Sequence, residues 1–219
     1  MNRILFEKFG DGVYISHLDV MRLFQRAFKR GGLHLKHSQG FSPRALVSVA
    51  LPLSVGVESR CEIMDYELVD QELPPEEIRQ RLNATMPRGI RVLEVYESDV
   101  KIKHLTHLDC TITLEYDAGV PAGAVEALEE LFARDSVTVM KKGKNGPTEQ
   151  DIIPMLASME VCRSGEQELC LHARICAQNP TLNPAQIVAA IEAYLPHVKP
   201  DFARIRREEV YGDDGKVFR

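Results

Sequence analysis

The order of strand-like and helix-like segments repeats once along this chain, and this repeat limits the folds that the chain can adopt. Residues 3–9 alternate apolar and polar side chains, which predicts a strand, and residues 17–30 have the apolar spacing of an amphipathic helix. Before residue 100 we expect three further strands, a helix and a closing strand, at residues 33–37, 45–51, 62–69, 74–84 and 91–98 respectively.

The second half of the chain has the same rhythm. We expect strands at residues 107–116, 136–141, 159–163, 168–176 and 203–211, helices at 122–133 and 183–195, and a flexible basic loop at 141–146. Each half therefore has the order strand–helix–strands–helix–strand, which is that of a ferredoxin-like βαββαβ unit with an extra strand. The prediction is an α+β fold of two tandem ferredoxin-like units with mostly antiparallel sheets, at residues 1–100 and 101–219.

Composition indicates an ordinary globular protein with an unusual distribution of charge. The 219 residues are 44% hydrophobic and 27% charged, with a formal net charge of −5. Residues 1–50 hold eight Lys or Arg and three Asp or Glu, a net +5, so the remaining residues carry −10. This balance argues against a protein that coats nucleic acid indiscriminately, and it leaves room for a local basic patch.

Targeting signals and cysteine usage point to the cytoplasm. The chain contains no run of about 18 apolar residues, the length expected of a membrane-spanning helix, and its start lacks the apolar stretch of a signal peptide. Five cysteines without framework spacing are typical of reduced thiols. We therefore expect a cytoplasmic protein that has no membrane partner.

The first helix has two chemically distinct faces. Ser16 is a good N-cap with Asp19 three residues later, and Gly31-Gly32 should end the helix. The apolar face consists of Val20, Leu23, Phe24, Ala27, Phe28 and Gly31. The opposite face consists of Asp19, Arg22, Arg26, Lys29 and Arg30. We interpret this face as an anion-binding surface because arginine suits bidentate recognition of phosphate, while the alternative is a merely solvated face.

The segment after this helix extends the basic surface. Lys36, His37 and Arg44 follow closely, and Gln39–Arg44 (QGFSPR) predicts a tight loop. Gly40 permits a close backbone approach, and Phe41 could stack on a base. The alternative for Phe41 is a side chain that fills the core. The candidate anion- or nucleic-acid-binding residues are thus Arg22, Arg26, Lys29, Arg30, Lys36, Phe41 and Arg44.

An enzymatic site is the competing interpretation. His17, Asp19, Glu62 and Asp65 could together act on a small anionic substrate or nucleotide, although a packed histidine is the favoured interpretation of His17. Glu62 and Asp65 are an odd number of residues apart, so on one strand they point to opposite faces. The catalytic residues therefore stay open, and an enzyme is the less favoured alternative.

Motifs of self-sufficient catalysis are absent from the sequence. There is no iron–sulfur cysteine spacing, Walker loop, GxGxxG, HExxH or GxSxG. Cys170, His172 and Cys176 alternate onto one strand face, where positions two apart lie roughly 7 Å from each other, too far to chelate an ion. We therefore expect no metal site in this chain.

A resemblance adds a partner to this interpretation. Phe6–Lys8, SHLDVMR at Ser16–Arg22, SQGFSP at Ser38–Pro43, Leu53–Gly56 and REEVY at Arg207–Tyr211 resemble a bacterial family of radical-SAM-associated proteins. Arg26, Ser59, Glu62 and Asp65 contribute to the same resemblance. Members of that family occur alone or fused to radical SAM proteins with a cobalamin-binding-like domain. Arg44 stands where that family often has histidine, and arginine cannot serve as a base.

The resemblance implies an accessory protein that has no cofactor of its own. The iron–sulfur cluster, S-adenosylmethionine and cobalamin would belong to a radical SAM partner. The leading hypothesis is a module that presents RNA or a ribonucleoprotein to that partner. The alternatives are the small-substrate enzyme and a scaffold that only docks protein.

Overall fold

The computed structural model of the chain describes residues 1–69, 73–143 and 146–219. These residues form a mixed α+β fold with mostly antiparallel sheets, as the sequence predicts. Two compact units divide the chain. The N-terminal unit comprises residues 1–102 with residue 219, and the C-terminal unit comprises residues 103–218. The division lies two residues beyond the expected boundary.

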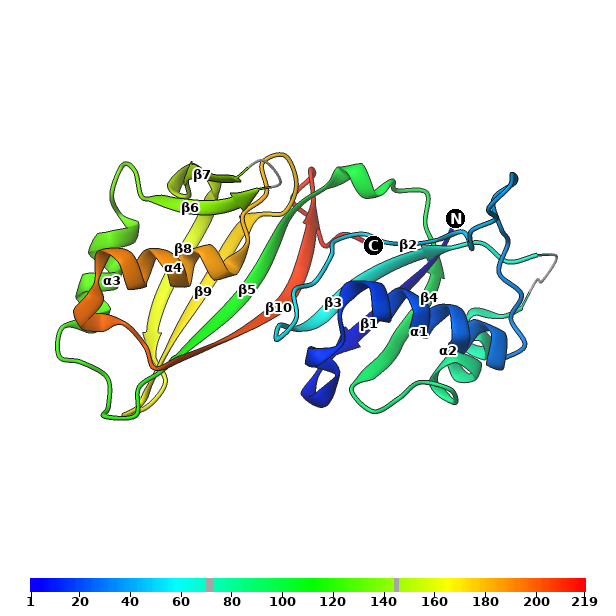
Figure 1. Cartoon of the computed structure of the whole chain (residues 1–219), viewed down its shortest axis with the longest axis horizontal. Helices are drawn as coiled ribbons and strands as arrows, with labels where there is room; N and C mark the ends of the chain where they lie inside the picture. Colours follow the sequence, from blue (N-terminus) through cyan, green and yellow to red (C-terminus); the bar gives the residue numbers. More distant parts are fainter. Residues whose placement is uncertain (70–72, 144–145) are drawn as a thin grey trace. The chain divides into compact units, whose positions relative to one another are not determined.

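The N-terminal unit places two helices on one face of an antiparallel sheet (Figure 1). The strands run in the order β4-β1-β3-β2, and every pair is antiparallel. The elements are β1 (Asn2–Lys8), α1 (His17–Arg30), β2 (Val47–Val49), β3 (Glu58–Tyr66), α2 (Pro75–Asn83) and β4 (Ile90–Glu97).

Aromatic side chains hold α1 against this sheet. The Phe24 ring meets Phe6 of β1 edge-on with centroids 4.8 Å apart, and the Phe28 ring lies 5.0 Å from that of Tyr66 on β3. These four side chains are almost completely buried. Because burying each such ring contributes about 1.5–3 kcal/mol, this contact fixes which face of α1 points outward.

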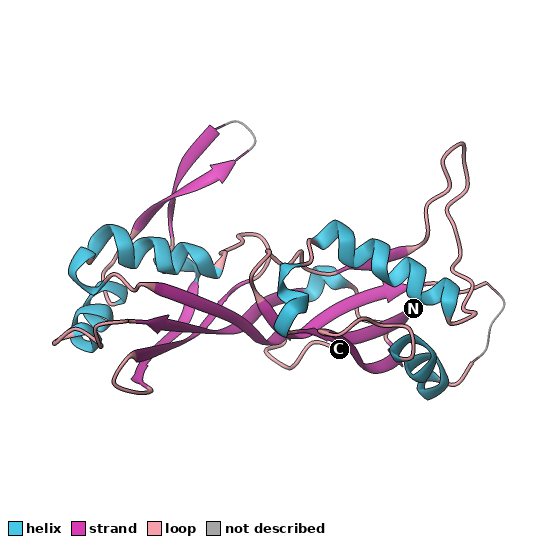
Figure 2. Ribbon diagram, turned by 60° about the horizontal axis from the view of Figure 1, so that its bottom comes forward, coloured by secondary structure: helices cyan, strands magenta, loops and turns pink. Residues whose placement is uncertain are grey.

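The C-terminal unit has a four-stranded antiparallel sheet in the order β10-β5-β9-β8, with α3 and α4 over one face. A separate hairpin of β6 and β7 extends away from this unit's helices (Figure 2). The elements are β5 (Leu105–Glu115), α3 (Ala124–Phe132), β6 (Thr138–Gly143), β7 (Gly146–Asp151), β8 (Leu156–Arg163), β9 (Glu168–Cys176), α4 (Pro184–Tyr194) and β10 (Phe202–Gly212).

Two expectations for local structure were wrong. The strand expected at residues 33–37 is absent; in its place two isolated bridges pair Leu35 with Leu68 and His37 with Ala45. Of the expected basic loop at residues 141–146, residues 141–143 belong to strand β6 and residue 146 begins strand β7, while residues 144–145 lie outside the described residues. Strand β7 (GPTEQD) could not be predicted from the sequence because its residues are mostly polar. A hairpin that stands away from a core needs no alternation of apolar and polar residues.

Candidate anion-binding site

The candidate site begins with the cap that positions α1. The Ser16 hydroxyl accepts a hydrogen bond from the Asp19 backbone N–H at 3.2 Å and donates one to the Asp19 carboxylate at 2.7 Å. This starts the helix at His17, as expected. Buried Val20, Phe24, Ala27 and Phe28 then turn Arg22, Arg26, Lys29 and Arg30 toward solvent.

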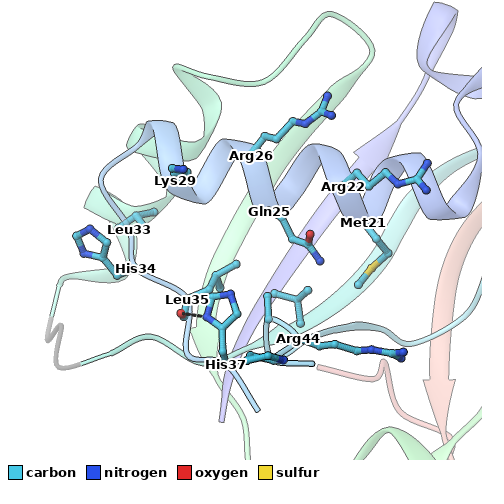
Figure 3. A pocket seen from close by; sticks show the side chains of 13 residues that line it. Met21, Arg22, Gln25, Arg26, Lys29, Leu33, His34, Leu35, His37 and Arg44 are labelled. Carbon is cyan, nitrogen blue, oxygen red and sulfur yellow. Dashed lines mark hydrogen bonds between the residues drawn. The ribbon is translucent and has the colours of Figure 1, made fainter. Parts of the chain in front are cut away.

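A groove of about 920 Å³ lies between α1 and residues 33–47 (Figure 3). Met21 and Gln25 project from α1 toward the segment that carries Leu35, His37 and Arg44. The lining residues are Met21, Arg22, Gln25, Arg26, Lys29, Leu33, His34, Leu35, His37, Pro43, Arg44, Ala45 and Val47. The structure thus brings four of the predicted cations (Arg22, Arg26, Lys29 and Arg44) to one concave surface.

A second hollow of about 640 Å³ lies on the other flank of the helix. Arg22 and Arg26 line it as well, together with Arg30 and with Thr85, Met86 and Pro87 from the segment after α2. These two arginines therefore stand on the ridge between two depressions, where a bound chain could contact them from either side.

Most of the cations on this surface lack a neutralising carboxylate. Arg22 Nη1 lies 2.9 Å from Asp19, and Lys36 Nζ lies 2.9 Å from Glu67. Within the described residues, the side chains of Arg26, Lys29, Arg30 and Arg44 form no ion pair. The two pairs that do form are exposed, and such pairs contribute about 0–1 kcal/mol, so a polyanion can displace them.

Asp19 is occupied by local interactions. Its carboxyl pKa lies below the ordinary value because the Ser16 hydroxyl donates a hydrogen bond to it, with further contributions from Arg22 and from the more distant charge of Arg26. The charged carboxylate also stabilises the helix N-terminus. Asp19 is therefore a cap and a partner of Arg22, a role that leaves it a weak base.

Two arginines on the sheet of the C-terminal unit provide a contrast. Arg174 binds Asp109 in a bidentate pair at 2.7 and 2.9 Å and stacks 3.8 Å over the Tyr211 ring. Arg204 pairs with Glu115 and, at 3.0 Å, with Glu168. These two arginines are thus neutralised within their unit, unlike most cations on the outer face of α1.

The loop after α1 presents an aromatic side chain to solvent. The Ser38 N–H donates to the Arg44 carbonyl at 2.8 Å, and the Arg44 N–H donates to the Ser38 hydroxyl at 3.0 Å, which closes a turn over residues 38–44. Phe41 at its tip is fully exposed, so the alternative of Phe41 as a core residue is wrong. Gly40 has φ +130°, a conformation that favours glycine.

The four candidate catalytic residues are not gathered into one site. His17 and Glu62 line a cavity of about 10 Å³, which has room for about one water molecule. Asp19 is on the helix surface, and Asp65 binds Arg3 at 2.6 Å. Lys8, which lies beside His17 and Glu62 and is 1% exposed, was not predicted, although a lysine within an apolar strand pattern was the available signal.

The described part of the chain contains no preformed cluster of metal-ligating side chains. No group of three or more His, Cys, Asp or Glu residues is placed there to hold a metal ion. Cys61 and Cys110 are buried as free thiols, and burial raises the pKa of Cys110 to about 12. No helix in the described ranges has the length and apolarity that crossing a membrane requires.

Residues 2–184 match a family model described as an uncharacterized protein conserved in bacteria (DUF2344). The chain belongs to this family. The family description names no reaction and no radical SAM partner, so the partner expected from the resemblance stays a prediction. No curated protein matches the sequence of this family member.

The fold has a counterpart among solved structures at low sequence identity. A chain of a Cbf5–Nop10–Gar1 complex is 10% identical with a TM-score of 0.54, over 95% of this chain and 48% of that one. A chain of an archaeal box H/ACA sRNP Nop10–Cbf5 complex is 10% identical with a TM-score of 0.48, over 94% of this chain and 46% of that one. This family member therefore spans about half the length of these chains. The likeness to the first of them extends to the fold alone.

Proposed function

We propose that this chain is a cytoplasmic accessory module that presents RNA, free or in a ribonucleoprotein, through the groove beside α1 and the 38–44 loop. The observation that carries the proposal is the set of cations on this surface that form no ion pair within the described residues: Arg26, Lys29, Arg30 and Arg44. Unneutralised guanidinium groups favour phosphate because they form bidentate, charge-assisted hydrogen bonds with it.

The charge of the rest of the chain supports a polyanionic ligand at this surface. Residues 1–50 carry +5 and the remainder −10, so a polyanion is repelled elsewhere and attracted here. The exposed Phe41 ring supplies a stacking surface in the loop that ends at Arg44. A repeating phosphate backbone can contact several cations at once, which a single small anion cannot do.

The radical SAM partner belongs to the same proposal and rests on the resemblance of the SHLDVMR and SQGFSP segments. In this arrangement the partner supplies the iron–sulfur cluster, S-adenosylmethionine and cobalamin, while this chain supplies binding. Recovery of an acidic protein partner without nucleic acid, after purification from the native host, would instead favour the docking scaffold.

We also propose that both units are ferredoxin-like. The N-terminal unit has the element order βαββαβ with sheet order β4-β1-β3-β2, and the C-terminal unit has the equivalent sheet order β10-β5-β9-β8 with the β6–β7 hairpin inserted. An experimental structure of each unit in which the strand orders differ from these would remove this assignment.

Removal of groove cations should weaken RNA binding and its salt dependence together. We expect Arg26→Ala/Lys29→Ala to lower the affinity for single-stranded RNA at least tenfold, because two cations that bind phosphate are removed. The slope of log K against log salt should become shallower by about 0.7 for each phosphate that is no longer neutralised. Fluorescence anisotropy across a salt series measures both quantities.

A matched control removes a cation elsewhere in the same unit. Arg79 lies on α2, pairs with Glu76 at 2.7 Å and lines neither hollow. Arg79→Ala should bind RNA as the unmodified chain does. Binding that is insensitive to salt, or equally weakened by both variants, would contradict the proposed function.

A further inference from the structure

We infer that the groove between α1 and residues 33–47 holds an unpaired nucleotide, with its ring on an apolar floor and its phosphates on the surrounding cations. This inference rests on the proposed function and narrows its ligand from RNA in general to a single strand. It concerns a property that charge alone does not determine, namely whether the bases are in contact with the protein.

The floor of the groove is apolar. Leu33 and Leu35 are buried, and Met21, Ala45 and Val47 are partly buried in the same lining. A phosphate gains nothing from such a surface, whereas a base offers a flat face that buries apolar area on it. The apolar floor of the groove therefore favours a ligand that has a ring as well as a charge.

Charged and polar side chains line the same groove. Arg22, Arg26 and Lys29 belong to α1, and Arg44 comes from the opposite segment. Gln25 projects into the groove and offers both an amide donor and an acceptor (Figure 3). His37 Nδ1 lies 2.9 Å from the Leu35 carbonyl, which only accepts, so Nδ1 donates and Nε2 of the neutral ring is left as an acceptor.

This layout favours a single strand over a duplex. In a duplex the bases are paired and stacked inside, so a duplex presents phosphates, riboses and base edges but no flat base face, and it leaves the apolar floor empty. An unpaired nucleotide can place its ring on the floor while its phosphates stay at the cations. The volume of about 920 Å³ lies within the usual range of small-ligand pockets, about 300–1,000 Å³, which suits one or two nucleotides.

The decisive experiment compares a single-stranded RNA oligonucleotide with its blunt duplex by fluorescence anisotropy. We expect the single strand to bind about tenfold more tightly, at the lower end of the free energy of one base–protein contact. Met21→Gln, which makes the floor polar without adding charge, should remove most of this preference and leave the salt slope unchanged. Leu18→Gln is the matched control, because Leu18 is on α1, is 64% exposed and does not line the groove.

A competition assay with the unmodified chain tests the same point without a substitution. Uridine monophosphate should displace the single strand at a concentration at least tenfold below that of inorganic phosphate. Equal binding of duplex and single strand, or equal competition by the two small ligands, would overturn the inference and leave the proposed function standing if the Arg26→Ala/Lys29→Ala effect persists. Failure of the unmodified chain to bind any RNA would overturn both.

Discussion

Replacement of Arg3 by Met is expected to lower the free energy of unfolding by about 3–5 kcal/mol, the usual cost of removing one partner of a buried ion pair. Arg3 on β1 is 0% exposed. Its guanidinium donates to the Asp65 carboxylate at 2.6 and 3.2 Å, to the Ser98 hydroxyl at 3.0 Å and to the Val100 carbonyl at 2.8 Å. Methionine retains the apolar stem and removes every one of these donors.

The expected cost arises mainly from the groups that are left behind. The Asp65 side chain is 16% exposed, so its charge would lose most of its compensation without gaining much water. Urea unfolding followed by circular dichroism gives the free energy. Hydrogen exchange in β1 and β3 assigns the reduced stability to the N-terminal unit, which matters because the chain has two units.

Arg79→Ala is again the control, since it removes an arginine from an exposed pair. It should cost less than about 1 kcal/mol. If Arg3→Met costs no more than Arg79→Ala, the buried network contributes little, and Asp65 is no longer accounted for by a structural role. That result would return Asp65 to the catalytic candidates.

The features of α1 could be predicted from sequence because their causes are local. Ser16 caps the helix, Gly31 ends it, and the bounds His17–Arg30 follow from interactions within four residues. The separation of an apolar from a basic face follows from the same periodicity. Local signals thus placed Arg22, Arg26 and Lys29 on an outward surface correctly.

The groove and the polar interior depend on contacts that a single sequence does not encode visibly. Arg3 meets Asp65 because β1 and β3 pair with Arg3 opposite Asp65, and this register joins residues 62 positions apart. Lys8 reaches the neighbourhood of Glu62 and His17 through the same pairing. Sequence periodicity predicts which side chains share one face of a strand, but it does not predict which strands pair. These neighbours therefore could not be predicted.

The segment between α1 and β2 shows a different limit. Residues 33–37 have the composition of a strand, yet Leu35 and His37 form only single bridges, to Leu68 and Ala45. The chain instead turns at residues 38–44, and Pro43 and Gly40 within this turn interrupt regular pairing. This irregular path forms the wall of the groove that faces α1. Because a regular strand was predicted at residues 33–37, the groove could not be predicted from the sequence.

Gly12→Ala is expected to destabilise the N-terminal unit strongly, with a cost on the order of 3 kcal/mol or more. A Cβ at Gly12 would lie 2.3 Å from the Gly89 carbonyl oxygen and 2.8 Å from its carbon. Both are backbone atoms, so no side-chain rotation relieves the overlap. The two segments would have to separate where the Phe9 N–H donates to the Gly89 carbonyl at 2.9 Å.

Gly10→Ala separates this clash from the general effect of adding a methyl group to the turn that leads into α1. Gly10 has φ +50° and nothing within 4 Å of a new Cβ, so its variant should lose only the roughly 1–2 kcal/mol that a left-handed residue costs. Urea unfolding of both variants provides the comparison, and RNA anisotropy should show a larger loss for Gly12→Ala because the turn at residues 10–14 precedes the Ser16 cap. Equal stability of the two variants would mean that the close approach of Gly12 to Gly89 is not required for the fold, and that the turn positions α1 through its caps alone.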